Sequence, residues 1–524
     1  MSTATVPRRD HATSKATRLL SAGTYLDPLY RKSVIKELLT NRFRVVAPSY
    51  GYDAVSVLAH ALAAHRLRRN QLLALGGGTL AILVLTVSGV VGFVVAPLLF
   101  VWLVWATAYL RRIATLQTLM TRLKDHPGGE FDGSYPATRR LTEGLVRKID
   151  HEQSSGSGTV FYGRYHPFVG AGQLVHEWSN AELLLGAPIG ALERSAGRAA
   201  ALAVGGMEIA PGFDELIGGE PRERKDIIPF TVAELTSYVA TRMTADLHDD
   251  APEDERITSL TVERRRYARA IRELKKTKHR AWSLAPADDE LPDVHWDDEY
   301  DSAREYLCVR VGSWNQELVT SIFVGFDIKG NTLHTEFYTY ALAPLIESFH
   351  LVDRLPDSLS GRLMWRVARD VAKGAPRDLV RLLVNPLRER LPRRLRKGRF
   401  LVETAPVVDY SEFRLGRYVT TTANCGARTS VREMATNKTF HHFFQESDTV
   451  KYTQIVERRL LKIIRDFLFE HNVDLDDHDA RQGDILNQHF GDNNNFGSGN
   501  LSVGNVGRQS LNNNSKAPGE KRRD

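Results

Sequence analysis

The feature that most constrains this chain is a long apolar run. Forty consecutive residues, from Gln71 to Leu110, contain no Asp, Glu, Lys or Arg. A membrane-spanning helix needs about 20 such residues, and one helix of this whole run would be about 60 Å long, roughly twice the hydrocarbon thickness. Two helices fit, with a turn near Ser88–Gly92, where small residues cluster. The sequence therefore predicts a transmembrane hairpin with helices over about 71–88 and 91–110.

Two other structures of this run remain open. A helical hairpin buried in a soluble core is disfavoured by the length of the uncharged segment. A re-entrant loop competes for the first half, because the Gly76–Gly78 run weakens a helix there. Trp102, Trp105 and Tyr109 would lie towards one membrane interface, as aromatic belts do.

The charges beside the run predict its orientation. Arg68 and Arg69 precede it, and Arg111 and Arg112 follow it. Positive residues collect on the cytoplasmic side, so both ends of the hairpin are expected there. The sequence thus predicts a multi-pass plasma-membrane protein with both termini in the cytoplasm and the lipid bilayer as a partner. These four arginines are candidate contacts for lipid headgroups or phosphates.

The net charge divides along the chain in a way that favours lipid over nucleic acid. The total is +7, but residues 1–150 contain 20 Lys and Arg against 9 Asp and Glu, so the remaining residues carry −4. The basic excess lies where anionic lipid would be, which makes a nucleic-acid partner unlikely. One basic cluster falls outside it and is either a solvated loop or a contact for lipid, phosphate or RNA. Its candidate residues are Arg393, Arg394, Arg396 and Lys397.

Motifs that mark common chemistries are missing. The sequence has no P-loop, no serine nucleophile elbow, no H-E-x-x-H, and only two distant cysteines, Cys308 and Cys425. We therefore expect no cofactor, no metal site and no recognisable catalytic residue, which favours a non-enzymatic protein. The acidic stretch Asp474–Asp479 is best explained as a loop, because it departs from the EF-hand pattern. The adjacent His441 and His442 are poor partners for one metal ion.

Downstream of the hairpin the pattern is typical of an α+β domain. Strands are predicted over 159–162, 172–185 and an antiparallel meander over 304–340, while 257–274 fits a strand or a helix. Helices are predicted over 231–245, 341–354, 359–373, 377–391 and 447–470. The predicted fold class is α+β: an N-terminal transmembrane helical hairpin plus a cytosolic domain with an antiparallel sheet and flanking helices.

The predicted organisation has five parts. Residues 1–70 form a cytosolic helical segment, 71–110 the hairpin, and 111–158 a juxtamembrane helix followed by a linker from about 125. Residues 159–487 form the α+β region. The Asn/Gly-rich tail, 488–524, is expected to be disordered, with a short stacked β segment as the alternative.

A glycine- and aromatic-rich loop, Tyr162–Gly172, is the best candidate ligand site. Such a loop can bind a ligand through backbone groups, or it can be a turn whose glycines adopt positive φ. Its candidate residues are Arg164, Tyr165, His166, Gly170 and Gly172.

Tyr165–Gly172 reads YHPFVGAG and resembles a Y-x-P-F-V-G-x-G motif of uncharacterised actinobacterial two-span membrane proteins. Further fragments look similar to the same family, at 25–27, 47–51, 307–309, 429–433 and 456–459. The resemblance implies a two-span N-terminal hairpin and a large cytosolic region, and it implies no catalytic residues.

Three hypotheses for function follow. The first is an integral inner-membrane protein whose cytosolic domain has a binding, sensing or scaffold role towards an unknown protein partner or a ligand. The second is a membrane-tethered enzyme of unrecognised class that uses the Tyr162–Gly172 loop. The third is an oligomeric membrane effector, because the small residues of the hairpin allow close helix contact and a homo-oligomer.

Overall fold

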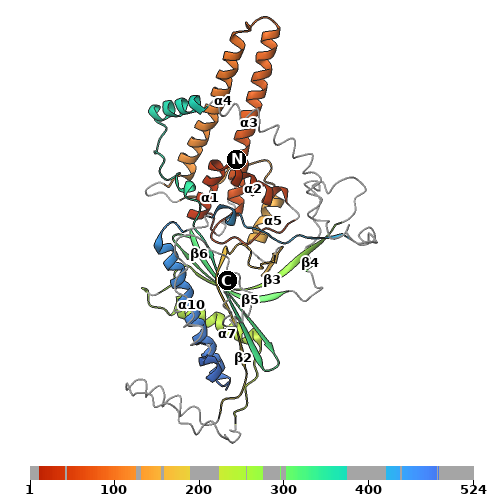
Figure 1. Cartoon of the computed structure of the whole chain (residues 1–524), viewed down its shortest axis with the longest axis vertical. Coiled ribbons are helices and arrows are strands. Elements are labelled where there is room, and N and C mark those ends of the chain that lie inside the picture. The colour runs from red at the N-terminus through yellow and green to blue at the C-terminus, as the bar shows by residue number, and fades with distance from the viewer. Residues whose placement is uncertain are drawn as a thin grey trace, which may run out of the picture.

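The computed structural model describes most of the chain. The described residues are 11–41, 44–125, 131–154, 158–163, 165–188, 224–254, 256–274, 295–296, 303–374, 421–436, 440–480 and 482. The predicted helix over 377–391, the basic cluster at 393–397 and the Asn/Gly-rich tail lie outside these residues. The molecule combines two long N-terminal helices in a hairpin with a mostly antiparallel sheet and flanking helices, which confirms the predicted α+β architecture (Figure 1).

The hairpin consists of α3 (Ala54–Val87) and α4 (Val95–Thr118), which η2 (Leu119–Leu123) continues. The Asp53 side chain caps the start of α3 by accepting from the backbone N–H groups of Val55 and Ser56. Gly89, with φ of +76°, lies in the turn between the helices, as the sequence predicts. The three glycines at 76–78 do not interrupt α3.

A helical bundle forms at the base of the hairpin. It contains α1 (Lys15–Leu26), α2 (Pro28–Ile35), η1 (Lys36–Thr40), α5 (Glu143–Gln153) and the first turns of α3. The prediction of a linker over 125–158 is wrong for α5. The Thr142 side chain caps this helix, and Leu145 and Ile149 lie one turn apart and are buried in the bundle core. Two buried apolar residues in a helix rich in charge make too weak a stripe to stand out in the sequence.

The sheet has the strand order β1-β3-β5-β6-β7-β2. Its main strands are β1 (Thr159–Tyr162), β2 (Gln173–Leu183), β3 (Leu260–Leu274), β5 (Arg304–Ser313), β6 (Leu318–Lys329) and β7 (Thr332–Leu342). Two short strands, β4 (His295–Trp296) and β8 (Thr421–Asn424), pair with the end of β3. Strand β1 pairs with β3 in parallel, and the other strand pairs are antiparallel.

Two helices cover one face of the sheet, namely α7 (Val232–Thr244) and α10 (Phe443–Glu470). A capping box begins α7, since Thr231 and Glu234 each cap the other's backbone. Two further helical turns are the π turn η4 (Ala245–Asp249) and the 3-10 turn η7 (Glu433–Ala435).

The predicted helix over 341–354 is wrong in most of its length. Strand β7 continues to Leu342 because Tyr340, Ala341 and Leu342 pair with β6, and α8 comprises only Glu347–His350. The next predicted helix is confirmed, because residues 361–374 are helical. The ambiguous segment 257–274 is a strand, and its side chains alternate between exposed and buried from Arg264 to Tyr267.

Candidate functional site

The base of the hairpin brings together arginines from separate segments. The guanidinium of Arg111 on α4 donates to Oε1 of Gln71 on α3 at 2.7 Å. Arg31 of α2 is nearly buried and donates to the carbonyl of Thr24. Burial, together with the positive charges of Arg68 and Arg111, lowers the pKa of Arg31 to about 10, while Asp27 opposes this shift. We call Arg31, Arg68 and Arg111 the arginine collar.

The side chains of the arginine collar are suited to bind a phosphate group. Arginine keeps its charge and presents a planar fork of donors that matches phosphate oxygens, and several mutually repelling cations are relieved by one bound anion. Arg69 and Arg112 are exposed beside it. Sequence reasoning found Arg68, Arg69, Arg111 and Arg112 from their position beside the apolar run. It missed Arg31, which lies 40 residues before that run and is brought to it only by the packing of α2 against α3.

The glycine-rich loop is occupied from within the chain. The Glu433 carboxylate accepts from the backbone N–H of Gly170 at 2.9 Å, from that of Gly172 at 3.3 Å and from that of Ser430 at 2.7 Å. Burial raises the pKa of Glu433, and these backbone donors oppose the rise. Two N–H groups that could have bound a ligand therefore already hold an internal carboxylate.

The remaining candidates in this loop point elsewhere. The Tyr165 side chain is 90% exposed, and His166 is exposed beside it, whereas Gly170 is buried and Gly172 is half-buried. Arg164 lies outside the described residues. The structure therefore separates the loop into a solvent-facing half and a buried half. Both glycines have positive φ, so the structural interpretation of the motif fits them.

Phe168 explains the aromatic part of the same motif. Its ring stacks on Phe323 of β6 with centroids 4.1 Å apart and meets the edges of Tyr267, Tyr306 and Tyr340. It thus fills the centre of the core on the sheet face opposite α7 and α10.

Arg432, next to Glu433, joins the sheet to the helical bundle. Its side chain is fully buried and donates to the carbonyl of Tyr50 and to that of Glu317, both at 2.7 Å. Burial lowers the pKa of Arg432 to about 10, with Glu317 among the charges that oppose the shift. Three fragments far apart in the sequence, at 47–51, 165–172 and 429–433, therefore meet at one place.

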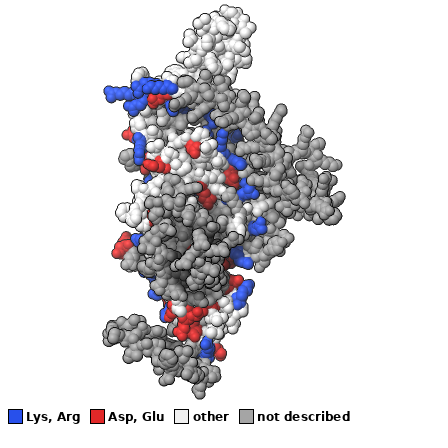
Figure 2. Space-filling view, viewed as in Figure 1, with Lys and Arg blue, Asp and Glu red and all other residues white. Residues whose placement is uncertain are grey.

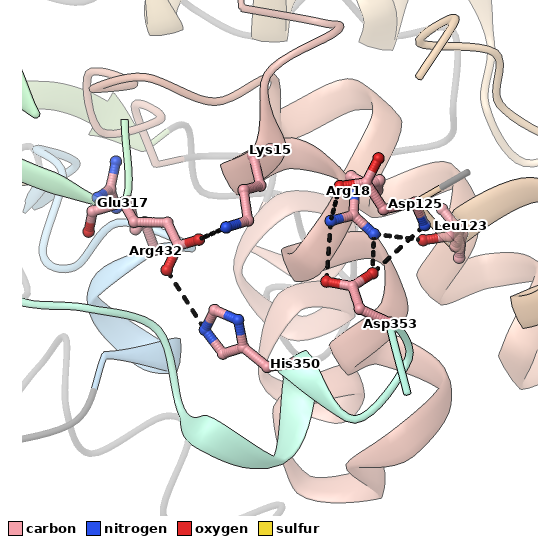
Figure 3. A network of polar contacts seen from close by, with 8 residues as sticks. All are labelled: Lys15, Arg18, Leu123, Asp125, Glu317, His350, Asp353 and Arg432. Carbon is pink, nitrogen blue, oxygen red and sulfur yellow. Dashed lines mark hydrogen bonds and ion pairs between the residues drawn. The ribbon is translucent and has the colours of Figure 1, made fainter. Parts of the chain in front are cut away.

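Ion pairs surround this junction (Figure 3). The Glu317 carboxylate lies 2.7 Å from Nζ of Lys15 on α1 and 3.3 Å from Nε2 of His350 on α8. Glu317 follows a turn in which Trp314, Asn315 and Gln316 all have positive φ, an uncommon conformation for residues other than glycine.

A second ion pair lies beside the first one. Arg18 of α1 forms a two-pronged pair with Asp353 and also donates to the carbonyl of Leu123 at 2.8 Å. The chain segments after α4 and after α8 are thereby tied to α1, and the polar groups of the junction are directed at each other.

The other sequence candidates have structural partners. His478, inside the acidic stretch, is buried and pairs with Glu182 at 3.0 Å. His441 packs edge-on against His350, while His442 stacks on Trp314. Among the described residues, no group of three or more His, Cys, Asp or Glu side chains is arranged to hold a metal ion.

Comparison with known families gives the class of protein. The family described as the AbeC-like domain matches residues 177–506, which is more than half of the chain, so the chain belongs to this family. The matched region runs from β2 through α10 and includes Arg432 and Glu433, whereas the hairpin precedes it. No curated protein and no solved structure matches the chain.

Proposed function

We propose that this protein is an integral protein of the plasma (inner) membrane, anchored by the hairpin with both termini in the cytoplasm. The observation that carries the proposal is the exposure of the hairpin. Both helices are long and apolar enough to cross a membrane. In the most apolar stretch of α3 no residue is buried, and in that of α4 only 6% of the residues are buried. Val87 at the end of α3 and Phe93 in the tip loop are more than four-fifths exposed. Apolar surface of this extent is a binding surface, and lipid is its natural partner.

Two further observations support this arrangement. Figure 2 presents the end of the hairpin as a cap without charged side chains, with Lys and Arg below it. The arginine collar lies where the hairpin meets the bundle, as expected on the cytoplasmic side. The resemblance to two-span membrane proteins favours the same topology.

We infer a binding, sensing or scaffold role for the α+β body. Its buried charged residues Arg432, Glu433 and Glu317 form hydrogen bonds and ion pairs with other segments of the same chain. This favours a structural role of these residues over a catalytic one. The helix α3 runs without a break from the bundle into the hairpin, so a partner bound to the body is coupled rigidly to the membrane anchor.

A homo-oligomer is a second candidate with support in the hairpin. The two helices enclose an apolar groove of about 840 Å³ that is lined by residues of both, including Leu83 and Phe100. Gly76 lines this groove, and both Gly76 and its neighbour Gly77 have open space where a side chain would be. Small residues on an open helix face permit close approach of another helix in lipid.

Extraction of membranes tests the anchoring. The full-length protein should stay with the membrane pellet after an alkaline carbonate wash and should be released by detergent. A variant with Leu80→Arg and Leu98→Arg places two charges on exposed lipid-facing positions, each costing about 3 kcal/mol at the centre of a bilayer. We expect carbonate to release this variant. The control, Leu183→Arg and Ile228→Arg, changes two exposed apolar residues of the α+β body and should remain in the pellet. Release of the unmodified protein by carbonate alone would overturn the proposal.

A further inference from the structure

One helix outside the hairpin lies against it. The helix over 361–374, teal in Figure 1, lies beside α4 and runs across it. Trp105 of α4 donates its indole N–H to the carbonyl of Ala368 in this helix at 3.1 Å. Trp105 also stacks on Tyr109 with ring centroids 5.4 Å apart. The contact is six residues, or about 9 Å, beyond Arg111 towards the tip of the hairpin.

The helix has three different sides. Val367 and Val371 are one turn apart and buried, and they form the side that packs on the protein. The second side is basic, because i, i+4, i+7 and i+11 spacing puts four cations within one narrow sector. The third side is apolar and exposed, with Trp365 exposed by 66% and Met364 by 38%. The four basic residues, all exposed, are Arg362, Arg366, Arg369 and Lys373.

The basic residues and the tryptophan of this helix are placed as in helices that bind a lipid surface. Asp370 is the only acidic residue of the helix, which leaves an excess of three positive charges. Arg369 lies over the Trp365 ring at 5.2 Å, and Gly361, Arg362, Trp365, Arg366 and Arg369 line a surface pocket of about 480 Å³. Figure 2 shows Lys and Arg gathered over this helix, next to the uncharged hairpin. Tryptophan and arginine side by side are typical of helices in the headgroup layer.

We propose that the helix over 361–374 is an interfacial helix that binds the anionic lipid surface into which the hairpin inserts. Its apolar side enters the boundary between headgroups and acyl chains, and its basic side contacts lipid phosphates. The inference rests on the proposed membrane anchoring, in which the axis of the hairpin runs across the bilayer. It adds a second membrane contact, contributed by a segment far from the hairpin in sequence.

The test follows an environment-sensitive fluorophore on single cysteines of the full-length protein in vesicles. The native Cys308 and Cys425 are buried, so an introduced exposed cysteine is the reactive one. The probe is placed at Ala372→Cys in the helix, at Val84→Cys in the hairpin and at Ser237→Cys on α7 of the body. The vesicles are phosphatidylcholine with or without phosphatidylglycerol, and they carry a lipid quencher either near the headgroup or near the chain end.

We expect the Ala372→Cys probe to be quenched best by the shallow quencher, and more strongly with phosphatidylglycerol. The Val84→Cys probe, near the tip of the hairpin, should be quenched by the lipid quenchers in either kind of vesicle, and the Ser237→Cys probe by neither quencher. Arg366→Gln with Lys373→Gln should weaken the lipid-bound state of the helix by about fivefold for each removed charge. The matched control, Lys451→Gln with Lys462→Gln, removes two exposed cations of α10 and should leave the quenching unchanged.

The outcomes separate the two proposals. Quenching at Val84→Cys without quenching at Ala372→Cys would overturn the interfacial helix and leave the anchor intact. Loss of quenching at both positions would overturn both proposals. If quenching at Ala372→Cys were the same with and without phosphatidylglycerol, and unchanged by the glutamine substitutions, the assignment of anionic lipid as the partner would be overturned.

Discussion

Arg432 and Glu433 are adjacent charged residues that both satisfy backbone groups of distant segments. Arg432 donates to the carbonyls of Tyr50 and Glu317, and Glu433 accepts from the backbone N–H groups of Gly170 and Gly172. Such buried charges are costly to leave unpaired, so their partners must be present in every folded molecule. The residues of the sequence motifs therefore hold the fold together at one junction.

Gly172 gives a direct test of the close approach of the loop to the sheet. Its φ is +98°, and a Cβ atom there would lie 2.2 Å from the carbonyl oxygen of Ala341, which is fixed in the sheet between β6 and β2. We expect Gly172→Ala to lower the free energy of unfolding by about 3 kcal/mol, from strain and overpacking together. Urea unfolding in detergent measures the loss.

The control for this substitution is Gly330→Ala. Gly330 also has positive φ, at +59°, but a Cβ atom there meets open space. We expect a cost of about 1 kcal/mol, from the backbone conformation alone. Equal losses for the two variants would contradict the close approach of Gly172 to β7.

His350 makes the junction sensitive to pH. Burial lowers the pKa of His350 and outweighs the Glu317 carboxylate, while Lys15 and His441 add to the lowering and Asp353 opposes it. The unfolded chain then binds the proton more readily, so the free energy of unfolding should fall as pH drops below about 6.5. Urea unfolding between neutral and mildly acidic pH measures this slope.

Substitution of His350 isolates its share of that slope. In His350→Gln the fall of stability with decreasing pH should become shallower than in the unmodified protein. The control is His166→Gln, which replaces an exposed histidine outside the junction and should keep the original slope. An unchanged slope in His350→Gln would show that the histidine does not titrate differently in the two states.

At the scale of elements, local sequence patterns were informative. The meander over β5, β6 and β7 follows from three runs rich in Val, Ile, Thr, Phe and Tyr that turn residues separate, and the long helix α10 follows from a period-3.6 apolar stripe. The short helix α5 was not predicted from the sequence, because only two apolar residues form its buried side. The predicted helix over 341–354 failed because pairing with β6 decides the end of β7, and pairing is a tertiary contact.

Close packing of α3 against α4 depends on one of three consecutive glycines. A Cβ atom at Gly78 would lie 2.5 Å from the Leu103 side chain, whereas one at Gly76 would meet nothing within 4 Å. We expect Gly78→Leu to separate the helices and to cost about 1–3 kcal/mol, measured as a lower melting temperature in detergent.

Gly76→Leu is the matched control, and it should change stability by less than about 0.5 kcal/mol. If Gly76→Leu were as damaging as Gly78→Leu, the open side of α3 would be in contact with another helix in the membrane. That result would favour the homo-oligomer over a hairpin that contacts only lipid.

For the whole molecule, the topology predicts what can be reached from each side of the membrane. Ser88→Cys lies in the tip of the hairpin, and the native cysteines are buried. We expect a membrane-impermeant maleimide to label this cysteine in intact cells, because the proposed two-span topology places the turn between α3 and α4 on the outer side of the membrane. Mass-tagging on a gel measures the labelled fraction.

The control for topology is Ser237→Cys on the exposed side of α7, which should be labelled only after the cells are permeabilised. Protection of Ser88→Cys in both conditions would mean that the hairpin turns back inside the bilayer. Labelling of Ser237→Cys in intact cells would place the body on the outside and contradict the predicted orientation.

The sequence by itself determined the hairpin, its turn and its basic flanks, because an uncharged run and the arginines beside it are local features that need no partner to be recognised. It also determined most strands and helices, since burial of one face leaves a periodic pattern. Only the tertiary structure decided which polar groups meet. The collar needs Arg31 beside Arg68, the junction needs Glu433 beside Gly170, and the interfacial helix needs Ala368 beside Trp105. Each of these contacts joins segments far apart in the chain, and their proximity results from packing of the whole core.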